Sequence, residues 1–214
     1  METAIDKIIR SRPTILQILE DRGFDTKLFQ NELPTDLIAK SSAPLLNEIE
    51  LELLRVQVPA KTGTEKGHIL YWMGGSVRPK LNDKEKFEKL LPEGIEENDQ
   101  IIILLNEPLH EAFHMMAVRR WAHKKERVSF FDIRQVISNP KDHSMVPPHR
   151  KVLPEEMEPL LEKLLVKSKL ELPHIKYHLD MQARILGLLP GEIVEIIRAS
   201  PTIGEYKVYR ICTA

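Results

Sequence analysis

The sequence is poor in cysteine and has no long apolar run. Cys212 is the only cysteine among 214 residues, which excludes an intramolecular disulfide and any zinc site built on several thiolates. The longest unbroken apolar runs are far too short to span a bilayer, and residues 1–10 mix acids and bases without the apolar core of a signal peptide. We therefore expect an intracellular, soluble protein that is neither secreted nor membrane-spanning.

The chain also lacks an excess of charge of either sign. Its 31 Lys and Arg residues nearly balance 32 Asp and Glu residues, for a formal net charge of −1. No global basic field is available to hold nucleic acid, so any such contact must be local. The sequence contains no Gly-rich phosphate loop, no Ser-His-Asp order signature and no thiol nucleophile with a local motif. With 42% hydrophobic residues, the chain can nevertheless bury folded cores.

The first two thirds of the sequence alternate between helix and strand patterns. Apolar residues from Ile5 to Leu19 recur at helical spacing, with Pro13 able to kink the helix and Gly23 a plausible stop. The expected strands are 48–53, 68–72, 100–105 and 127–131, and the expected later helices are 83–91 and 108–123. This order predicts an α/β domain with a mixed sheet and flanking helices, over residues 1–141.

A turn-forming cluster at 139–142 separates this part from the rest, so the second expected domain covers residues 142–214. Pro154 suits the first turn of a helix whose apolar stripe runs from Met157 to Leu165, and Gly187 is placed to end a second helix. The segments 192–198 and 206–211 predict a hairpin with one buried face. We expect a small α+β domain: helices packed on a short sheet that ends in a C-terminal hairpin.

One motif suggests chemistry. Residues 110–114 read H-E-x-x-H, so that on a helix His110 and His114 could bind zinc with Glu111 as base. A zinc-dependent hydrolase is therefore an alternative function. The extended protease pattern would need glycine and histidine where this chain has Ala117 and Arg120, which argues against it. His143 and His149 have no acid or cysteine spaced to complete a metal site, so ordinary hydrogen bonds are expected for them.

The densest basic patch lies just after this motif. It comprises Arg119, Arg120, Lys124, Lys125 and Arg127. Such a patch is either a solvated helix face or a contact for phosphates, which Lys and Arg neutralise without reading sequence. A free-standing DNA-binding module is a third hypothesis, against which the near-neutral net charge argues.

Several motifs carry a resemblance to a known family. They are Arg12-Pro13-Thr14 through Phe24, His143 to His149, Leu172-Pro173-His174-Ile175, Asp180, Ala183-Arg184, Gly187, Gly191 to Arg198, Ser200, Thr202, Gly204, Tyr206 and Tyr209-Arg210. Together they resemble the fifth subunit shared by eukaryotic nuclear RNA polymerases and its shorter archaeal counterpart. Met181, Ile203 and Glu107 depart from the family pattern, which indicates a divergent member, and Glu107 would repel phosphate.

The resemblance implies a non-catalytic polymerase subunit without a metal or cofactor of its own. In that family the C-terminal domain docks on the largest subunit, near other small subunits, and the N-terminal domain forms a jaw beside downstream duplex DNA, with a weak and non-specific contact. The implied subunit-interface residues are His149, Arg184, Gly187, Arg198, Tyr206, Tyr209 and Arg210. The implied DNA side comprises Asn106, Pro108, Arg119, Arg120 and Lys124. The implied location is the nucleus or, if the source is a large DNA virus, the viral factory or virion.

Overall fold

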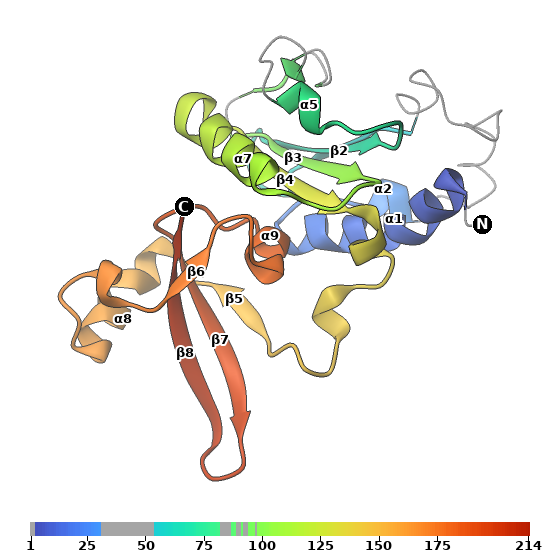
Figure 1. Ribbon diagram of the computed structural model, residues 1–214. Helices are drawn as coiled ribbons and strands as arrows, with labels where there is room; N and C mark the ends of the chain where they lie inside the picture. The colour runs from blue at the N-terminus through green and yellow to red at the C-terminus, as the bar shows by residue number, and fades with distance from the viewer. Residues whose placement is uncertain (1–2, 31–53, 82–86, 89–90, 92–93, 97) are drawn as a thin grey trace. The chain divides into compact units, whose positions relative to one another are not determined.

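The computed structural model describes residues 3–30, 54–81, 87–88, 91, 94–96 and 98–214. The chain divides into two compact units, Met1–Ser138 and Asn139–Ala214, which Figure 1 colours from blue to yellow and from yellow to red. The strand expected at 48–53 and most of the helix expected at 83–91 lie outside the described residues. Among the described helices, none has the length and apolarity needed to cross a membrane.

The N-terminal unit is built on a mixed sheet. Its strands are β1 (Val56–Pro59), β2 (Lys66–Trp72), β3 (Gln100–Leu105) and β4 (Arg127–Asp132), adjacent in that order. β1 is antiparallel to β2, whereas β2, β3 and β4 are parallel, with Leu70, Ile103 and Phe130 in register. The strands predicted at 68–72, 100–105 and 127–131 are thereby confirmed, whereas β1 was not predicted.

Helices cover both faces of this sheet, which explains why every residue of β3 is buried. α1 (Ala4–Asp21) covers one face: its Arg12 donates to the Tyr71 hydroxyl of β2 at 3.0 Å. α7 (Glu111–Lys124) covers the other, where Phe113 packs on Phe130 with ring centroids 5.1 Å apart. The N-terminal unit therefore has the α/β architecture with flanking helices that the sequence predicted (Figure 1).

Local sequence sets the limits of α1. Thr3 and Asp6 form a capping box at its start, and Pro13 lies inside the helix rather than dividing it. Gly23 follows the helix with φ of 98°, a conformation that favours glycine. Gly67 of β2 lies beneath the end of α1, where an added Cβ would come within 3.1 Å of side-chain atoms of Leu19 and Phe24. Glycine at this position therefore allows the helix to pack closely on the strand, and a larger residue would require the side chains of Leu19 and Phe24 to shift.

α7 begins three residues later than expected. Residues 108–110 are not helical, and His110 has extended backbone (φ −119°) as the residue before the first helical turn. The expectation that Pro108 starts the helix was therefore wrong. The remaining described elements of this unit are short: α2 (Lys27–Gln30), α5 (Arg78–Leu81) and a 3-10 turn, η1 (Ile133–Val136).

The C-terminal unit contains a second mixed sheet. Its strands are β5 (His149–Lys151), β6 (His174–Lys176), β7 (Ile193–Ser200) and β8 (Gly204–Thr213), arranged as β5-β7-β8-β6. Its helical elements are α8 (Pro154–Leu164), α9 (Met181–Leu186), η2 (Pro140–Asp142) and η3 (Lys169–Glu171). The small α+β fold with a terminal hairpin is as predicted, whereas β5 and β6 were not.

One hydrophobic cluster of this unit joins α8 to one face of the sheet. Val152, Leu160, Leu172, Ile193 and Ile211 form it. Pro154 occupies the first turn of α8, as expected. The expected apolar stripe does not continue to the end of the helix: Leu165 follows it in left-handed conformation and is 91% exposed.

α9 has a well-defined start and stop. The Asp180 carboxylate accepts hydrogen bonds from the backbone N–H groups of Gln182 and Ala183, at 2.8 and 3.2 Å, and so caps the first turn. Gly187 ends the helix with φ of 61°, as its position in the sequence predicted.

Candidate functional site

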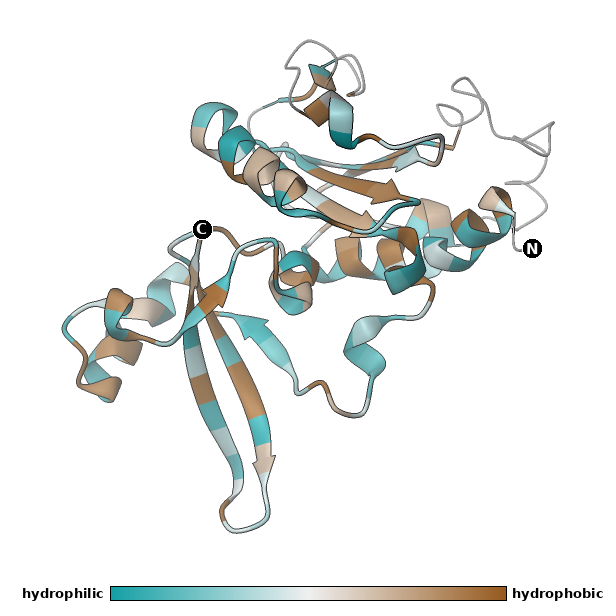
Figure 2. Cartoon of the chain, in the orientation of Figure 1, coloured by the Kyte–Doolittle hydropathy of each residue, from teal (hydrophilic) through white to brown (hydrophobic). Residues whose placement is uncertain are grey.

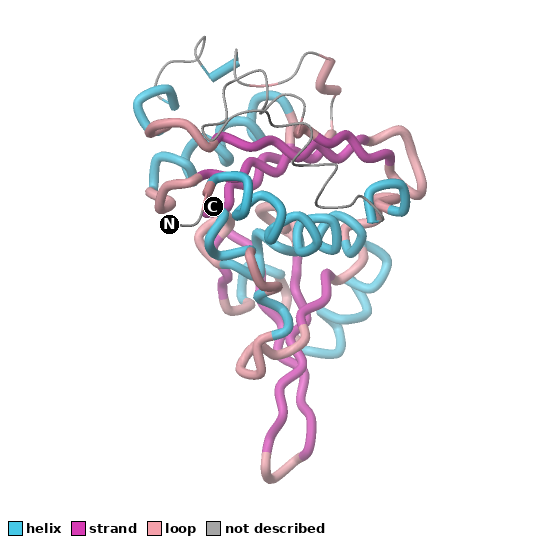
Figure 3. The backbone as a smooth tube through the Cα atoms, turned by 90° about the vertical axis from the view of Figure 1, so that its right-hand side faces the viewer, coloured by secondary structure: helices cyan, strands magenta, loops and turns pink. Residues whose placement is uncertain are grey.

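The hairpin β7-β8 extends beyond the helices of its own unit (Figures 1 and 3). Its base is buried from Ile193 to Ile196, whereas β8 is exposed from Gly204 to Lys207. The turn carries Ile203, which is 67% exposed. The expectation of one buried face is therefore wrong. Consecutive strand residues point to opposite faces, so both faces are buried at the base, whereas the hairpin is largely exposed toward its tip.

Four of the seven residues implied as a subunit interface share one face of this sheet. Cross-strand partners lie on the same face, and the register pairs Arg198 with Tyr206, Ile196 with Val208 and Val194 with Arg210. His149 of β5 pairs with Ile196 and joins the same face. We call Arg198, Tyr206, Val208, Arg210 and His149 the hairpin face. Figure 2 shows hydrophobic bands between hydrophilic stretches of β8.

The hairpin face combines charge with partly covered apolar area. Arg198 is exposed and Tyr206 is 37% exposed, whereas Val208 and Arg210 are half-buried. Burial lowers the pKa of His149, although its Nδ1 lies 2.6 Å from the Pro147 carbonyl. A partner could therefore meet two arginines and a tyrosine, residue types that often contribute strongly to protein interfaces.

Tyr209 lies on the opposite face, in a polar network that the sequence did not indicate. Its hydroxyl donates to the Glu195 carboxylate at 2.8 Å, and burial together with that contact raises the pKa of Tyr209 to about 12. Lys207 and Arg150 also donate to Glu195, at 3.2 and 3.4 Å, and Arg150 pairs in addition with Glu156. A glutamate within the apolar run 193–197 was the only available signal of this network.

The remaining two implied interface residues are not on the hairpin face. Arg184 is buried, and Gly187 serves the end of α9 through its backbone conformation. His143 and His149 both make ordinary local hydrogen bonds, as expected: the His143 ring accepts from the Met145 N–H at 3.2 Å.

In the N-terminal unit, the loop after β3 is anchored on two sides. Asn106 accepts a hydrogen bond from Lys7 Nζ at 2.8 Å. The Glu107 carboxylate accepts from the Ser76 hydroxyl and the Val77 N–H, each at 2.7 Å. Pro108 is exposed. Glu107, which departs from the family pattern, thus connects the loop after β3 to the loop after β2 by hydrogen bonds. Both loops lie at the carboxyl edge of the parallel strands.

The three basic residues implied for the DNA side differ in environment. Arg119 is exposed, whereas Arg120 is buried and forms ion pairs with Glu88 and Glu126. Lys124 is exposed but donates to the same Glu88 carboxylate at 2.7 Å. Burial opposes ionisation of Glu88, yet hydrogen bonds from Lys124 and Arg120 hold the pKa of Glu88 below its usual value. Arg120 is therefore not available to a phosphate in this structure.

The end of α7 is not a uniformly solvated basic face either. Lys125 Nζ lies 5.1 Å and the Arg127 guanidinium carbon 5.7 Å from the centre of the Trp121 ring. These two cations therefore pack on an aromatic side chain within the patch itself.

The H-E-x-x-H residues are not arranged as a metal site. His110 precedes the helix and lines a cavity with Glu111, whereas His114 belongs to the buried stripe of α7. Arg78 and Arg119 line the same cavity and oppose binding of a cation there. Within the described ranges, no group of three or more His, Cys, Asp or Glu side chains could hold a metal ion.

The fold and the exposed hairpin define a class: a two-unit protein in which an α/β unit precedes a small α+β unit with an extended C-terminal hairpin. The family model described as "RNA polymerase Rpb5, C-terminal domain" matches residues 138–212, which is almost the whole of the second unit.

Curated relatives extend this match to the whole chain. The "DNA-directed RNA polymerases I, II, and III subunit rpabc1" of Dictyostelium discoideum is 24% identical over 209 residues, covering 97% of this chain and 98% of the relative. The "DNA-directed RNA polymerase subunit 5-like protein 1" of Arabidopsis thaliana is 23% identical over 212 residues, 98% of this chain and 97% of the relative. The "DNA-directed RNA polymerase subunit Rpo5" of Thermococcus kodakarensis is 44% identical over 70 residues, 33% of this chain but 83% of the relative.

The chain belongs to the Rpb5/Rpo5 family of DNA-directed RNA polymerase subunits. The archaeal relative is matched by about a third of this chain, whereas the two eukaryotic relatives are similar along nearly all of it.

Proposed function

We propose that this chain is a non-catalytic subunit of a multisubunit DNA-dependent RNA polymerase. The observation that carries the proposal is the family match over residues 138–212, which falls on the unit with the exposed hairpin. The catalytic metal ion and the nucleotide are then bound by other subunits. This chain contributes contacts with neighbouring subunits and with duplex DNA.

The C-terminal unit docks on the largest subunit through the hairpin face, near neighbouring small subunits. Arg198 and Tyr206 support this assignment because they lie side by side on an exposed part of the hairpin. A tip that packs on nothing in its own unit has no apparent structural use within that unit. Its arginine and aromatic side chains suit an interface core.

The N-terminal unit acts as a jaw that borders downstream duplex DNA. The candidates for this side are Asn106, Pro108, Arg119 and Lys124. Arg120 is not one of them, because it is buried and forms ion pairs with two glutamates. Glu107 keeps a negative charge in the same loop, so the contact is weak, non-specific and sensitive to salt.

The eukaryotic relatives favour a nuclear location for this protein. The name of the Dictyostelium relative refers to polymerases I, II and III, and the match to it includes the N-terminal unit. A viral factory or virion is the location if the source is a large DNA virus.

Co-purification tests the docking role. The tagged chain is expressed in its native source, and the large polymerase subunits recovered with it are quantified by mass spectrometry. A variant with Arg198→Glu and Tyr206→Ala is expected to recover at least tenfold less of the largest subunit. Lys167→Glu, which reverses an exposed charge after α8, is the control and should recover as much as the unmodified chain.

Two results would contradict the docking role. Equal recovery with the hairpin variant would exclude the hairpin face as the docking surface. A chain recovered alone, with about one zinc ion per molecule, would instead support the hydrolase alternative and its residues His110, Glu111 and His114.

A further inference from the structure

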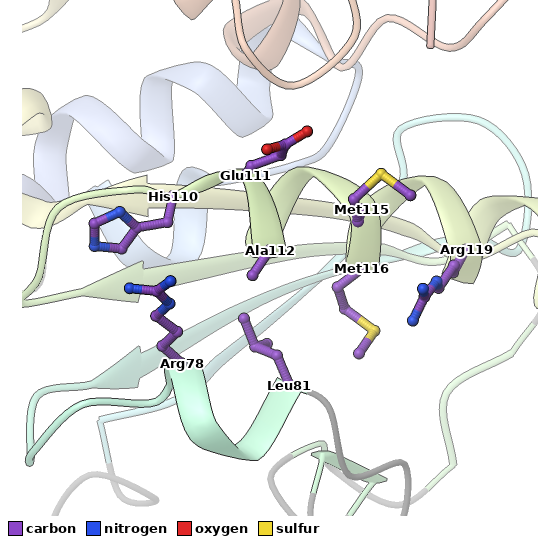
Figure 4. A pocket seen from close by; sticks show the side chains of 8 residues that line it. All are labelled: Arg78, Leu81, His110, Glu111, Ala112, Met115, Met116 and Arg119. Atoms are coloured by element: carbon purple, nitrogen blue, oxygen red, sulfur yellow. The ribbon is translucent and has the colours of Figure 1, made fainter.

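The N-terminal unit contains a cavity between α5 and α7 that neither the docking face nor the anchored loop uses. It has a volume of about 440 Å³. Its lining residues are Arg78, Leu81, His110, Glu111, Ala112, Met115, Met116 and Arg119 (Figure 4).

One face of α7 forms most of this groove. The lining positions Ala112, Met115, Met116 and Arg119 recur at helical spacing and are distinct from the buried positions of the same helix. Met115 is 42% exposed, although most large apolar side chains of this unit are buried. Figure 4 shows Ala112 and Met116 pointing toward Leu81 of α5, whereas Met115 points to the other side of α7. The groove therefore has an apolar floor between the two helices, with Met115 exposed at its rim.

Basic side chains lie at both ends of the groove. Figure 4 shows Arg78 and His110 at one end and Arg119 at the other, with the two methionines between them. In the part of the chain that the structure describes, neither the Arg78 nor the Arg119 side chain forms a hydrogen bond or ion pair. By contrast, the neighbouring Arg120 is bound by glutamates.

We propose that this groove binds a short extended segment of another protein, with an apolar side chain flanked on both sides by carboxylates. Arginine binds carboxylates with two parallel hydrogen bonds, and methionine adapts its shape to varied apolar side chains. Along a helix, the stretch from His110 to Arg119 corresponds to about 13 Å. The four steps between the first and last residue of an extended five-residue peptide cover about the same length, so the spacing acid-x-apolar-x-acid fits the groove.

Duplex DNA fits the same surface less well. A phosphate backbone offers no apolar group for Leu81, Met115 and Met116. The combination of an apolar floor with arginines at both ends thus favours a protein segment, whether or not the C-terminal unit docks as proposed above. Arg119 then belongs to this groove, and Asn106, Pro108 and Lys124 are the candidates left for the DNA side.

Methyl NMR on the full chain tests the proposal. Methionine methyl groups are labelled with carbon-13, and the signals of Met115 and Met116 are assigned from Met→Leu variants. The probe is the peptide Asp-Ser-Leu-Ser-Asp, acetylated and amidated at its ends. We expect saturable shifts of the Met115 and Met116 signals, and at least tenfold weaker binding of two control peptides, Asn-Ser-Leu-Ser-Asn and Asp-Ser-Ser-Ser-Asp.

Variants of the chain separate this site from non-specific attraction. Arg78→Gln combined with Arg119→Gln is expected to weaken peptide binding at least tenfold. Arg10→Gln, at an exposed arginine of α1, is the matched control and should leave it unchanged. All three arginines are exposed, so circular dichroism spectra should not differ.

Three outcomes would overturn the proposal. One is equal binding of the acidic and the neutral peptide, and another is unchanged binding by the double arginine variant. The third is displacement of the peptide by a duplex oligonucleotide that shifts the same two methyl signals, which would assign the groove to nucleic acid.

Discussion

At the scale of single residues, Arg119 and Arg120 show how far neighbours in a basic patch can differ. Arg119 points to solvent at the end of a groove, whereas Arg120 is buried against Glu88 and Glu126. Removing one partner of a buried ion pair leaves the other charge uncompensated, at a cost of about 3–5 kcal/mol. The two residues should therefore respond very differently to the same substitution.

We predict that Arg120→Met lowers the free energy of unfolding of the N-terminal unit by about 3 kcal/mol, because Glu126 is then left buried without its cation. Arg119→Met should change it by no more than about 0.5 kcal/mol. Urea unfolding followed by tryptophan fluorescence measures this, since both tryptophans, Trp72 and Trp121, lie in this unit. Similar losses for the two variants would contradict the assigned environments.

Glu195 gives a prediction for pH. Burial opposes its ionisation, but hydrogen bonds from Tyr209, Arg150 and Lys207 dominate and lower the pKa of Glu195 in the folded state. The stabilisation that follows is complete above the unfolded pKa, about 4.3, and is lost as pH falls through the lower folded value. Glu195→Gln should therefore cost about 1–3 kcal/mol at neutral pH and less at strongly acidic pH.

Calorimetric unfolding of the full chain from neutral to acidic pH measures this difference. Glu205→Gln, at an exposed position of β8, is the control and should follow the unmodified protein at every pH. A destabilisation by Glu195→Gln that grows as pH falls would contradict the account, because its sign would then be reversed.

Sequence reasoning succeeded for residues whose role is local and failed for those whose role depends on distant partners. Gly187 and Pro154 act through the backbone of their own helices, so their positions in the sequence were sufficient. The partners of Arg120 include Glu88, which lies 32 residues away. No spacing rule could indicate that pair.

At the scale of elements, strands with a clear local sequence pattern were predicted, whereas strands that depend on pairing with distant partners were not. β3 is a buried parallel strand and reads as a continuous apolar run. β5 consists of three polar residues, His149 to Lys151, and is a strand because it pairs with β7. Short edge strands such as β5 and β6 carry no periodic signal of their own, which is why the sequence did not predict them.

The hairpin gives a prediction at this scale. In the proposed variant, Asn-Gly replaces residues 199–205 and directly joins Arg198 to its cross-strand partner Tyr206. Asn-Gly forms a two-residue turn that suits the twist of antiparallel strands. Because the deleted side chains bury little area in their own unit, the melting temperature should fall by no more than about 2 °C. Differential scanning calorimetry measures it. A fall of about 10 °C, equivalent to more than 1 kcal/mol, would show that the tip stabilises the unit itself.

At the scale of the whole molecule, the eukaryotic relatives match nearly the whole chain, whereas the archaeal relative matches about a third of it. The Thermococcus relative is covered to 83% by only 70 residues of this chain. The unmatched 17% of that relative is far too short to hold a counterpart of residues 1–138. The C-terminal unit of this chain has its own core around Ile193 and Ile211.

We therefore predict that residues 139–214 fold alone when expressed without the rest of the chain. Proton NMR should show dispersed amide signals, and urea unfolding should be a single cooperative transition. Ile193→Ala, which removes a core side chain, is the comparison and should cost about 3 kcal/mol. Collapsed amide signals and a transition without cooperativity would show that this unit depends on the N-terminal one.

Purification of the tagged chain from its native source, with an assay for RNA synthesis on the eluate, tests the central claim most directly. The polymerase assignment predicts stoichiometric recovery with two large polymerase subunits, together with DNA-templated RNA synthesis. Recovery of the chain without those subunits and without that activity would contradict it.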